Sequence, residues 1–332
     1  MKRKVRILGT GAYLPEREVS ALEIDTRLGT KPGWVEKKSG VLTRRFVGTE
    51  TAAWMGAKAA EMALEHAKVT LDEIDCIVSA SGTVEQAIPC TASLIYHHLD
   101  PSHMKIPAFD FNATCLSFVA AFDHLSYLIS AGRYQNILLV SSEIASIGLN
   151  WKQKESSSLF GDGAAAVVIG PSSKQDASHI MSSRMETYPQ GVHTTEIRGG
   201  GTKHHPRTYK GEVNWEDFLF DMDGEAVFRL TAKFLPDFVK RLFTDTSKTL
   251  QEVDLVIPHQ ASVMAMKLIQ RRLKLTEGQM MMIAPQYGNM IAASIPFALH
   301  LAIQSGQLQR DQTSLLLGTS AGLSFGGILF VY

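Results

Sequence analysis

The chain repeats part of its own pattern at long range. The pattern Leu71-x-Glu73-Ile74-Asp75-x-Ile77-Val78 recurs as Leu250-x-Glu252-Val253-Asp254-x-Val256-Ile257, and Ile129-Ser-Ala-Gly132 recurs as Ile303-Gln-Ser-Gly306. The two offsets nearly agree (250 − 71 = 179 and 306 − 132 = 174). A chance match of two short patterns is the alternative, but the near-constant offset favours a duplication with two similar halves packed about a pseudo-two-fold axis.

The duplication relates two polar residues at the starts of apolar helical patterns. Counting back 17 residues from Gly132 reaches Cys115, and counting back 17 residues from Gly306 reaches Asn289. In this register each half places a polar residue at the start of an equivalent buried helix. We therefore expect Cys115 and Asn289 to face each other across the axis.

Cys115 lies at a predicted turn between a strand and a helix. A strand-like apolar run at 106–111 precedes it, and apolar residues at helical spacing follow from Leu116 to a plausible C-cap at Gly132. Unpaired backbone N–H groups and the positive end of the helix dipole favour a thiolate there, which is the nucleophilic form of cysteine. The alternative is a small buried residue at a tight turn.

Composition narrows the class of protein. The 332 residues are 45% apolar and 20% charged, as in an ordinary globular protein, and the formal net charge of zero gives no overall attraction to nucleic acid or anionic membranes. Three irregularly spaced cysteines argue against a disulfide framework and favour a cytoplasmic location. The basic N-terminus lacks the apolar core of a signal peptide, and no run of about 18 apolar residues predicts a membrane span.

The pattern alternates between strands and helices along most of the chain. We expect strands at 5–13, 74–81, 136–142, 164–169 and 255–258, and helical segments at 20–39, 51–67, from Pro89, and at 223–243. The many small residues at 51–67 predict a helix packed closely on its neighbours. Residues 171–215 contain Gly199-Gly200-Gly201 among polar residues and predict a long irregular connection or flap.

Three short motifs suggest ligands only weakly. Gly9-x-Gly11 lacks the third glycine of a dinucleotide site, and Phe160-Gly-Asp-Gly163 lacks the Lys-Ser/Thr of a phosphate loop, so each is expected to be a turn. His204-His205 has neither helical HxxxH spacing nor nearby Cys and Asp ligands. We expect these histidines to face solvent and predict no metal site.

Three polar residues stand at the ends of apolar elements: Cys115, His259 and Asn289. This set fits thioester chemistry, in which a thiolate attacks an acyl thioester while His and Asn donate hydrogen bonds to the developing negative oxygen. A papain-like protease also uses Cys, His and Asn, so the triplet alone leaves the reaction open. Here the His and Asn belong to the second half of a duplicated α/β unit, which favours thioester chemistry.

The chain resembles the thiolase-fold condensing enzymes, most closely the β-ketoacyl-acyl-carrier-protein synthase III family. The resemblance rests on Asn112-Ala-Thr-Cys115, Phe160-Gly-Asp-Gly163, Pro258-His259-Gln260-Ala261, Tyr287-Gly-Asn289 and the Gly-rich end from Gly318 to Gly326. It implies a thiolase-like five-layer αβαβα fold of two duplicated halves. The expected parts are a first half over 1–170, the irregular connection over 171–215, and a second half over 216–332.

The resemblance also implies residue roles. Cys115 would accept the acyl group, and His259 and Asn289 would promote decarboxylation of a malonyl thioester and stabilise the enolate-like oxygen. The backbone N–H groups of Cys115 and Ala321 would form the oxyanion hole, with Ala321 at a position where the family usually has glycine. The family is homodimeric and uses no metal or redox cofactor, so none is expected here.

Departures from the family pattern concern the substrate. Trp34 is kept at the coenzyme A site, whereas Lys38 and Lys154 stand where arginines are usual and Met264 replaces a third. Lysine loses the planar stacking fork of arginine, which weakens the expectation of tight coenzyme A binding. Ile88 stands where an aromatic residue usually closes the partner's acyl pocket, which predicts a medium or branched acyl group. The substrate-binding set is Trp34, Lys38, Ile88, Lys154, Phe228 and Ser262.

The basic residues that would meet an acyl-carrier protein are kept: Arg229, Arg271 and Arg272. The expected function is decarboxylative condensation of an acyl thioester, on coenzyme A or a carrier, with malonyl-carrier protein in fatty acid biosynthesis. A specialised-metabolism condensing enzyme or acyltransferase is the alternative within the fold. A non-catalytic acyl-binding homologue is a third reading, against which the intact Cys-His-Asn set argues.

Overall fold

The computed structural model describes residues 2–100 and 105–332. Two sheets organise them. The first has the order β1 (Val5–Tyr13), β7 (Gly163–Pro171), β6 (Ile137–Glu143), β4 (Cys76–Ser79) and β5 (Ala108–Asp110). The second has the order β8 (His179–Thr187), β13 (Ser324–Val331), β12 (Thr313–Ser320) and β11 (Leu255–Pro258). Each predicted strand is present, within a few residues of its expected bounds.

The strand pairings of the two sheets are the same. β1 and β7, and β7 and β6, pair antiparallel, whereas β6–β4 and β4–β5 are parallel. In the second sheet β8–β13 and β13–β12 are antiparallel and β12–β11 is parallel. A parallel bridge between Val256 and Met280 takes the place of the β4–β5 pair. This shared order confirms the duplication.

Residues 171–215 were predicted to be an irregular connection, but they contain a strand of the second sheet. This strand is β8, which pairs along its whole length with β13 and is the counterpart of β1. The second half therefore begins near His179 rather than at residue 216. The sequence His-Ile-Met-Ser-Ser-Arg-Met-Glu-Thr of β8 lacks the alternation of a half-buried strand because most of its side chains are only partly covered. The rest of the segment is irregular, as expected.

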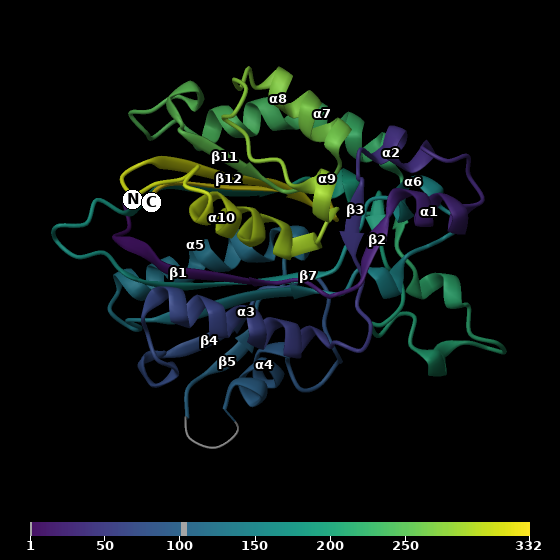
Figure 1. The fold of residues 1–332 in the computed structure, drawn as a ribbon, viewed down its shortest axis with the longest axis horizontal. Helices are drawn as coiled ribbons and strands as arrows, with labels where there is room; N and C mark the ends of the chain where they lie inside the picture. Colours follow the sequence, from purple (N-terminus) through teal and green to yellow (C-terminus); the bar gives the residue numbers. More distant parts are fainter. Residues whose placement is uncertain (1, 101–104) are drawn as a thin grey trace.

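Helices and sheets form five layers (Figure 1). The outer helices α3 (Ala52–Ala67) and α4 (Thr91–Leu99) cover the first sheet, and α7 (Gly224–Leu242) and α8 (Val263–Arg272) cover the second. Between the sheets lie α5 (Ser117–Ser130) and α10 (Ser294–Gln304). The expected αβαβα arrangement is confirmed.

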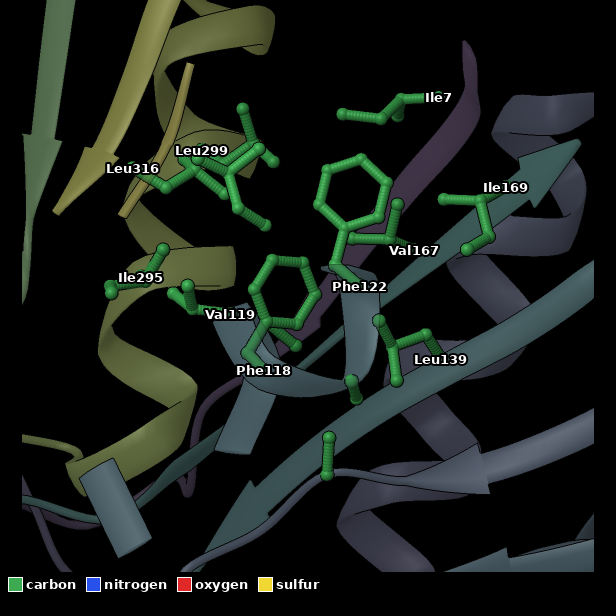
Figure 2. Close-up of a cluster of buried hydrophobic side chains, with 14 of the residues drawn as sticks. Ile7, Phe118, Val119, Phe122, Leu139, Val167, Ile169, Ile295, Leu299 and Leu316 are labelled. Carbon is green, nitrogen blue, oxygen red and sulfur yellow. The ribbon is translucent and has the colours of Figure 1, made fainter. Parts of the chain in front are cut away.

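The two central helices carry the main core (Figure 2). Phe118 and Phe122 of α5 are each 1% exposed and lie between residues of both sheets, such as Val167 of β7 and Leu316 of β12. A helix enclosed on all sides must be apolar around its whole circumference, which explains the long apolar run after Cys115. Because each large apolar side chain contributes about 1.5–3 kcal/mol on burial, this cluster fixes where both helices begin.

The close packing of α3 has a specific cause in β1. A Cβ atom added to Gly9 would lie 2.3 Å from the backbone nitrogen of Ala67, and one added to Gly11 would lie 2.2 Å from the carbonyl oxygen of Ala59. The two glycines are therefore needed for close approach of the helix and not for a dinucleotide site. The turn predicted at 9–11 is wrong, because both glycines lie within β1 and pair with β7. The small-residue interpretation of 51–67 holds.

Shorter elements gather at one end of the layers. They include α1 (Ala21–Leu28), α2 (Trp34–Ser39), α6 (Lys154–Ser157), α9 (Ala284–Tyr287), the ribbon of β2 (Glu18–Ser20) with β3 (Thr43–Arg45), and the ribbon of β9 (Thr195–Glu196) with β10 (Asp221–Met222). The segment 20–39 thus forms two helices rather than one. Short 3-10 turns complete the chain: η1 (Leu71–Glu73), η2 (Thr114–Leu116), η3 (Ser146–Gly148), η4 (Pro189–Gly191), η5 (Pro206–Thr208), η6 (Trp215–Phe218), η7 (Leu250–Glu252) and η8 (Ile291–Ala293). No helix within the described ranges is long and apolar enough to cross a membrane.

Candidate active site

Each central helix is preceded by the same turn. In the first half, Asn112 Oδ1 accepts a hydrogen bond from the Thr114 N–H at 2.8 Å, and Ser117 Oγ accepts one from the Ala113 N–H at 2.9 Å. The second half repeats both bonds. Asn289 Oδ1 accepts from the Ile291 N–H at 2.9 Å, and Ser294 Oγ accepts from the Met290 N–H at 3.0 Å.

This geometry corrects the register of the duplication. Thr114 and Ile291 both have positive φ angles, 52° and 46°, in the region that side chains rarely adopt. The turns therefore superpose with an offset of 289 − 112 = 177 residues, so Asn112 is the counterpart of Asn289 and Ala292 is the counterpart of Cys115. The predicted equivalence of Cys115 and Asn289 is wrong because α10, with 11 residues, is three shorter than the 14-residue α5.

Contacts across the halves nevertheless bring the three candidate residues together. The turn η2, which contains Cys115, packs against η8, directly after Asn289, and against β12. His259 follows β11, and its backbone N–H bonds to the Leu317 carbonyl of β12 at 2.8 Å. A Cβ atom added to the next residue, Gly318, would lie 3.0 Å from both the His259 Cβ and a methyl group of Leu116. Cys115, His259 and Asn289 thus surround one region.

The Cys115 thiol is enclosed, although part of the residue touches solvent. Burial raises the pKa of this thiol to about 12, and the Glu143 carboxyl adds to the effect. The backbone N–H groups of Ala321 and of Cys115 itself lower the pKa, but by less than burial raises it. The predicted resting thiolate is therefore wrong, because desolvation outweighs the helix N-terminus. The same contacts place the two expected oxyanion donors at the sulfur.

This raised pKa predicts how Cys115 is alkylated. Below its pKa the thiolate fraction grows about tenfold per pH unit, so the rate with iodoacetamide is expected to climb steadily between pH 6 and 9. Peptide mapping during the reaction measures the rate at Cys115, with Cys90 as the internal comparison. A rate at Cys115 that is already constant below pH 8 would show a resting thiolate and contradict the burial argument.

His259 is neutral in this environment. It is 6% exposed, and burial lowers its pKa to about 4. Its Nδ1 atom is buried and has no hydrogen-bond partner in the described part of the chain. An imidazole that is uncharged at neutral pH carries one N–H donor and one free acceptor nitrogen. It can donate to a substrate oxygen without holding a buried positive charge.

The Phe160-Gly-Asp-Gly163 motif holds the Asn289 turn. The Asn289 N–H bonds to the Leu159 carbonyl at 2.8 Å, and the Gly161 N–H bonds to the Asn289 carbonyl at 3.1 Å. The carboxylate of Asp162 accepts hydrogen bonds from the Val47 and Ser146 backbones at 2.9 and 2.8 Å. The motif is thus a turn before β7, as expected, and its carboxylate fixes the chain that supports Asn289.

An apolar cavity of about 390 Å³ opens beside the Asn289 turn. Its lining includes Ile291 and Phe160 from the turn and its support, Val84 and Ile147 from loops after β4 and β6, and Phe218 and Phe220 from the segment that runs from η6 to β10. Because these side chains are apolar, the cavity suits a hydrocarbon group rather than a charged one.

The expected nucleotide-contact residues lie on neighbouring helices. Trp34 begins α2 and Lys38 lies in its last turn, while Lys154 begins α6, and the two helices are in contact. Lys38 Nζ lies 3.9 Å from a carboxylate oxygen of Glu155, so its charge is partly paired. Ser262 caps α8 by accepting from the Ala265 N–H at 3.2 Å.

One cation–π pair in this area was not recognised from the sequence. The guanidinium of Arg27 lies 3.6 Å from the ring centre of Trp151, and Trp151 packs on the same apolar cluster as Trp34. This supplies a planar cation stacked on an aromatic ring near the positions where lysines replace arginines. Only long-range packing joins these residues, so no local sequence signal marks them.

The remaining candidates lie on the surface. Arg229 and Phe228 are exposed on α7, and Arg271 is exposed on α8 beside Arg272, which donates to the Ala232 carbonyl of α7 at 3.2 Å. The three arginines thus occupy two contacting helices. Ile88 is 85% exposed and does not line the cavity of its own chain.

Of the histidine pair, His205 faces solvent as expected, whereas His204 is half-buried beside Asp217. His204 Nδ1 lies 3.4 Å from a carboxylate oxygen of Asp217, and His205 is exposed. No cluster of three or more metal-ligating side chains occurs among residues 2–100 and 105–332.

Comparison with known proteins identifies the family. Residues 109–189 match the family described as 3-oxoacyl-[acyl-carrier-protein] synthase III, and residues 243–332 match its C-terminal part. The β-ketoacyl-[acyl-carrier-protein] synthase III of Aquifex aeolicus is 30% identical over 327 residues, covering 98% of this chain and 99% of that protein. The chain belongs to the β-ketoacyl-acyl-carrier-protein synthase III family.

Solved structures of related ketosynthases have the same fold as this chain. The crystal structure of the Aquifex aeolicus enzyme superposes with a TM-score of 0.89 at 29% identity, covering 99% of this chain and 100% of that one. The priming β-ketosynthase of the R1128 polyketide pathway gives a TM-score of 0.89 at 28% identity, covering 99% and 97%. The chain is therefore a condensing acyltransferase with the thiolase fold, and its family belongs to fatty acid biosynthesis.

Proposed function

We propose that this ketoacyl synthase III-like enzyme forms an acyl-Cys115 intermediate and condenses it with malonyl-carrier protein. Cys115 Sγ attacks the primer thioester carbonyl, the bond from that carbonyl to the primer's sulfur breaks, and the proton of the Cys115 thiol passes to the leaving thiolate. The malonyl group then loses carbon dioxide, and the resulting carbon attacks the acyl carbonyl. The bond between the acyl carbon and Cys115 Sγ then breaks, which releases the 3-oxoacyl thioester, and the sulfur takes up one proton from solvent to restore the thiol. The observation that carries this proposal is the position of Cys115, between the Ala321 N–H and the Asn289 turn.

The neutral state of His259 supports its role in the second step. Decarboxylation moves negative charge onto the malonyl thioester oxygen, and fixed hydrogen-bond donors there stabilise that charge. A buried His259 with a pKa of about 4 and the Asn289 amide supply uncharged donors. The backbone N–H groups of Cys115 and Ala321 would stabilise the oxyanion of each acyl-transfer step. No cofactor is needed for either step.

A product assay tests this function. The protein is incubated with an acyl thioester and malonyl-carrier protein, and both 3-oxoacyl product and carbon dioxide are measured. We expect the two in equal amounts. Acyl transfer to the carrier without release of carbon dioxide would instead make the enzyme a simple acyltransferase. Specialised metabolism remains the second candidate because the R1128 priming ketosynthase is as similar in structure as the fatty-acid enzyme.

We propose that an acidic acyl-carrier protein docks on α7 and α8. Arg229 and Arg271 are exposed there and form no ion pair with another residue of the described ranges, and both helices end in basic residues. Exposed charges of this kind mainly speed association and are screened by salt. Lys38 and Lys154 keep positive charge at the proposed coenzyme A site. The primer can therefore be carried either by coenzyme A or by the acyl-carrier protein.

Reversing the patch charge is expected to weaken use of the carrier. Arg229→Glu combined with Arg271→Glu should raise the KM for malonyl-carrier protein roughly tenfold at low salt and less at high salt, with kcat nearly unchanged. Arg272 is left intact because its bond to Ala232 joins the two helices. Arg133→Glu, an exposed site beyond the end of α5, is the matched control. An unchanged KM at low ionic strength would remove this surface from the proposal.

We further propose that Ile88 selects the acyl group from across a homodimer. Val84, Ile88 and Ile147 are 55%, 85% and 84% exposed, an apolar surface that a second copy of this chain would cover. Isoleucine fills less volume than an aromatic ring, and each additional buried methylene contributes about 0.8 kcal/mol. Medium or branched acyl groups are therefore favoured over acetyl.

Enlarging Ile88 tests this selectivity. Ile88→Phe should lower the ratio of the specificity constants for octanoyl and acetyl thioesters, because the ring would shorten the pocket. The rate of Cys115 alkylation should stay at the wild-type value, which controls for damage to the site. A wild-type preference for acetyl together with an unaltered ratio in the variant would contradict the pocket argument.

A further inference from the structure

Glu143 is a buried carboxyl group to which the proposed mechanism assigns no role. It ends β6, its side chain is fully buried, and it accepts four hydrogen bonds. Oε1 accepts from the Gly82 N–H at 2.5 Å and from the Ala292 N–H at 3.2 Å. Oε2 accepts from the Thr83 N–H at 2.9 Å and from the Thr83 hydroxyl at 2.5 Å.

These bonds join the two halves beside the reacting groups. Gly82 and Thr83 follow β4 in the first half, whereas Ala292 lies in η8 of the second. A Cβ atom added to Gly82 would lie 2.7 Å from Ile291 Cγ2, 3.3 Å from the Thr114 carbonyl carbon and 3.4 Å from Glu143 Oε1. Gly82, whose N–H donates to the carboxylate, therefore lies against both positive-φ residues, Thr114 directly before Cys115 and Ile291 two residues after Asn289.

The duplication gives this contact a chemical meaning. The 177-residue offset makes the Ala292 N–H the counterpart of the Cys115 N–H, which is the proposed oxyanion donor. Glu143 and Ser320 are likewise counterparts, since each forms the last pair of its strand, with Gly163 and with Ser324. In the second half a carboxylate oxygen thus occupies the position that the substrate oxyanion would take in the first. Serine has no carboxylate, so Ser320 leaves the corresponding position beside Cys115 to a substrate.

We propose that Glu143 is a positioning residue for condensation: its carboxylate fills the second half's copy of the oxyanion-binding turn and thereby fixes the turn that carries Asn289. The inference rests on the proposed roles of Cys115 and Asn289. Burial raises the pKa of Glu143 to about 7, while its four donors favour the charged form. A carboxyl group kept at this cost of desolvation, with one of its hydrogen bonds made to the turn after Asn289, fits a role beyond packing.

Glu143→Gln separates positioning from simple support of the fold. The amide has the same shape, but its NH₂ group replaces one acceptor and must face a backbone N–H of either Thr83 or the Gly82–Ala292 pair. The Cys115 turn keeps its own bonds to Asn112 and Ser117. We therefore expect acylation of Cys115 within about threefold of wild type, but condensation by the acyl-enzyme slowed roughly 10- to 100-fold, the scale of a small misplacement of a reacting group.

The experiment measures the two half-reactions by mass spectrometry in single turnovers, first with acyl thioester alone and then with saturating malonyl donor. Glu61→Gln on the exposed face of α3 is the matched control and should leave both rates unchanged. Glu143→Asp keeps the charge but is one methylene shorter, so it should also slow condensation selectively. It provides the same test if Glu143→Gln does not fold.

The outcomes distinguish this inference from the proposed function. Wild-type protein that forms no acyl-Cys115 would refute the function itself. Equal losses in both half-reactions of Glu143→Gln, or no loss in either, would overturn the positioning role. Full condensation activity in Glu143→Asp, combined with loss in Glu143→Gln, would show that negative charge alone is required. It would overturn the proposal that the carboxylate must fill the turn that carries Asn289.

Discussion

Cys115→Ala is expected to abolish condensation, lowering kcat/KM by about 10³-fold or more, because alanine has no atom that can hold the acyl group. The fold should persist, since the turn before α5 is held by Asn112 and Ser117 rather than by the thiol. Product formation from an acyl thioester and malonyl-carrier protein measures the loss. Slow decarboxylation of the malonyl donor should remain, because His259 and Asn289 are intact.

Cys90→Ala is the matched control for this change. Cys90 precedes α4 and is partly exposed, and its sulfur lies at hydrogen-bond distance from the Ser93 hydroxyl and the Ala108 carbonyl. Its replacement should leave condensation unchanged. Condensation by Cys115→Ala at a rate close to wild type would mean that the acyl group passes directly between thioesters, and the covalent mechanism would be wrong.

His259→Ala and Asn289→Ala are each expected to slow condensation by about 10²-fold, the usual scale for removing a donor aimed at developing charge. Uptake of the acyl group by Cys115 should continue, because that step depends on the Cys115 and Ala321 N–H groups. Release of carbon dioxide from the malonyl donor and single-turnover acylation measure the two steps separately.

The exposed His205→Ala serves as the control for this pair. If both active-site variants condense at the wild-type rate, His259 and Asn289 are structural residues. Loss of acylation by the same factor as condensation would point instead to a distorted Cys115 turn. Either result would contradict the proposal that Cys115 accepts the acyl group while His259 and Asn289 promote decarboxylation.

The family resemblance predicted the layers, and local patterns predicted many of the elements. Those patterns located β1, β4, β6, β7 and β11 and the central helix after Cys115, and the repeat indicated that a second such unit exists. They did not predict β8, β12 or β13. β8 was missed because its stability comes from pairing with β13 rather than from its own apolar pattern. Tertiary pairing of this kind leaves no period in the strand's own sequence.

The register error has a similar origin. Counting from Gly132 and Gly306 assumed helices of equal length, whereas α10 is three residues shorter than α5. The asparagines at 112 and 289 were visible in the sequence, and the matching serines at 117 and 294 would have given the correct offset. The sequence therefore contained both the glycine match and the asparagine match. The hydrogen bonds of the folded chain were needed to show that the asparagine match gives the register.

Several features of the site depend on contacts that no local pattern contains. The raised pKa of Cys115 follows from its enclosure by both halves, and the bond from Ala292 to Glu143 spans 149 residues. The stacking of Arg27 on Trp151 is equally non-local. The sequence therefore indicated candidate residues that the fold brings together, but it did not predict the raised pKa of Cys115 or the hydrogen bonds that support the Asn289 turn.

The most direct test of the central claim is the mass of the protein before and after incubation with an acyl thioester, followed by peptide mapping. The account predicts one added acyl group, on the peptide that contains Cys115, and its disappearance when malonyl-carrier protein is added and the 3-oxoacyl product forms. An acyl group on Cys76 or Cys90, or product formation with no acyl group on Cys115 at any time, would contradict it.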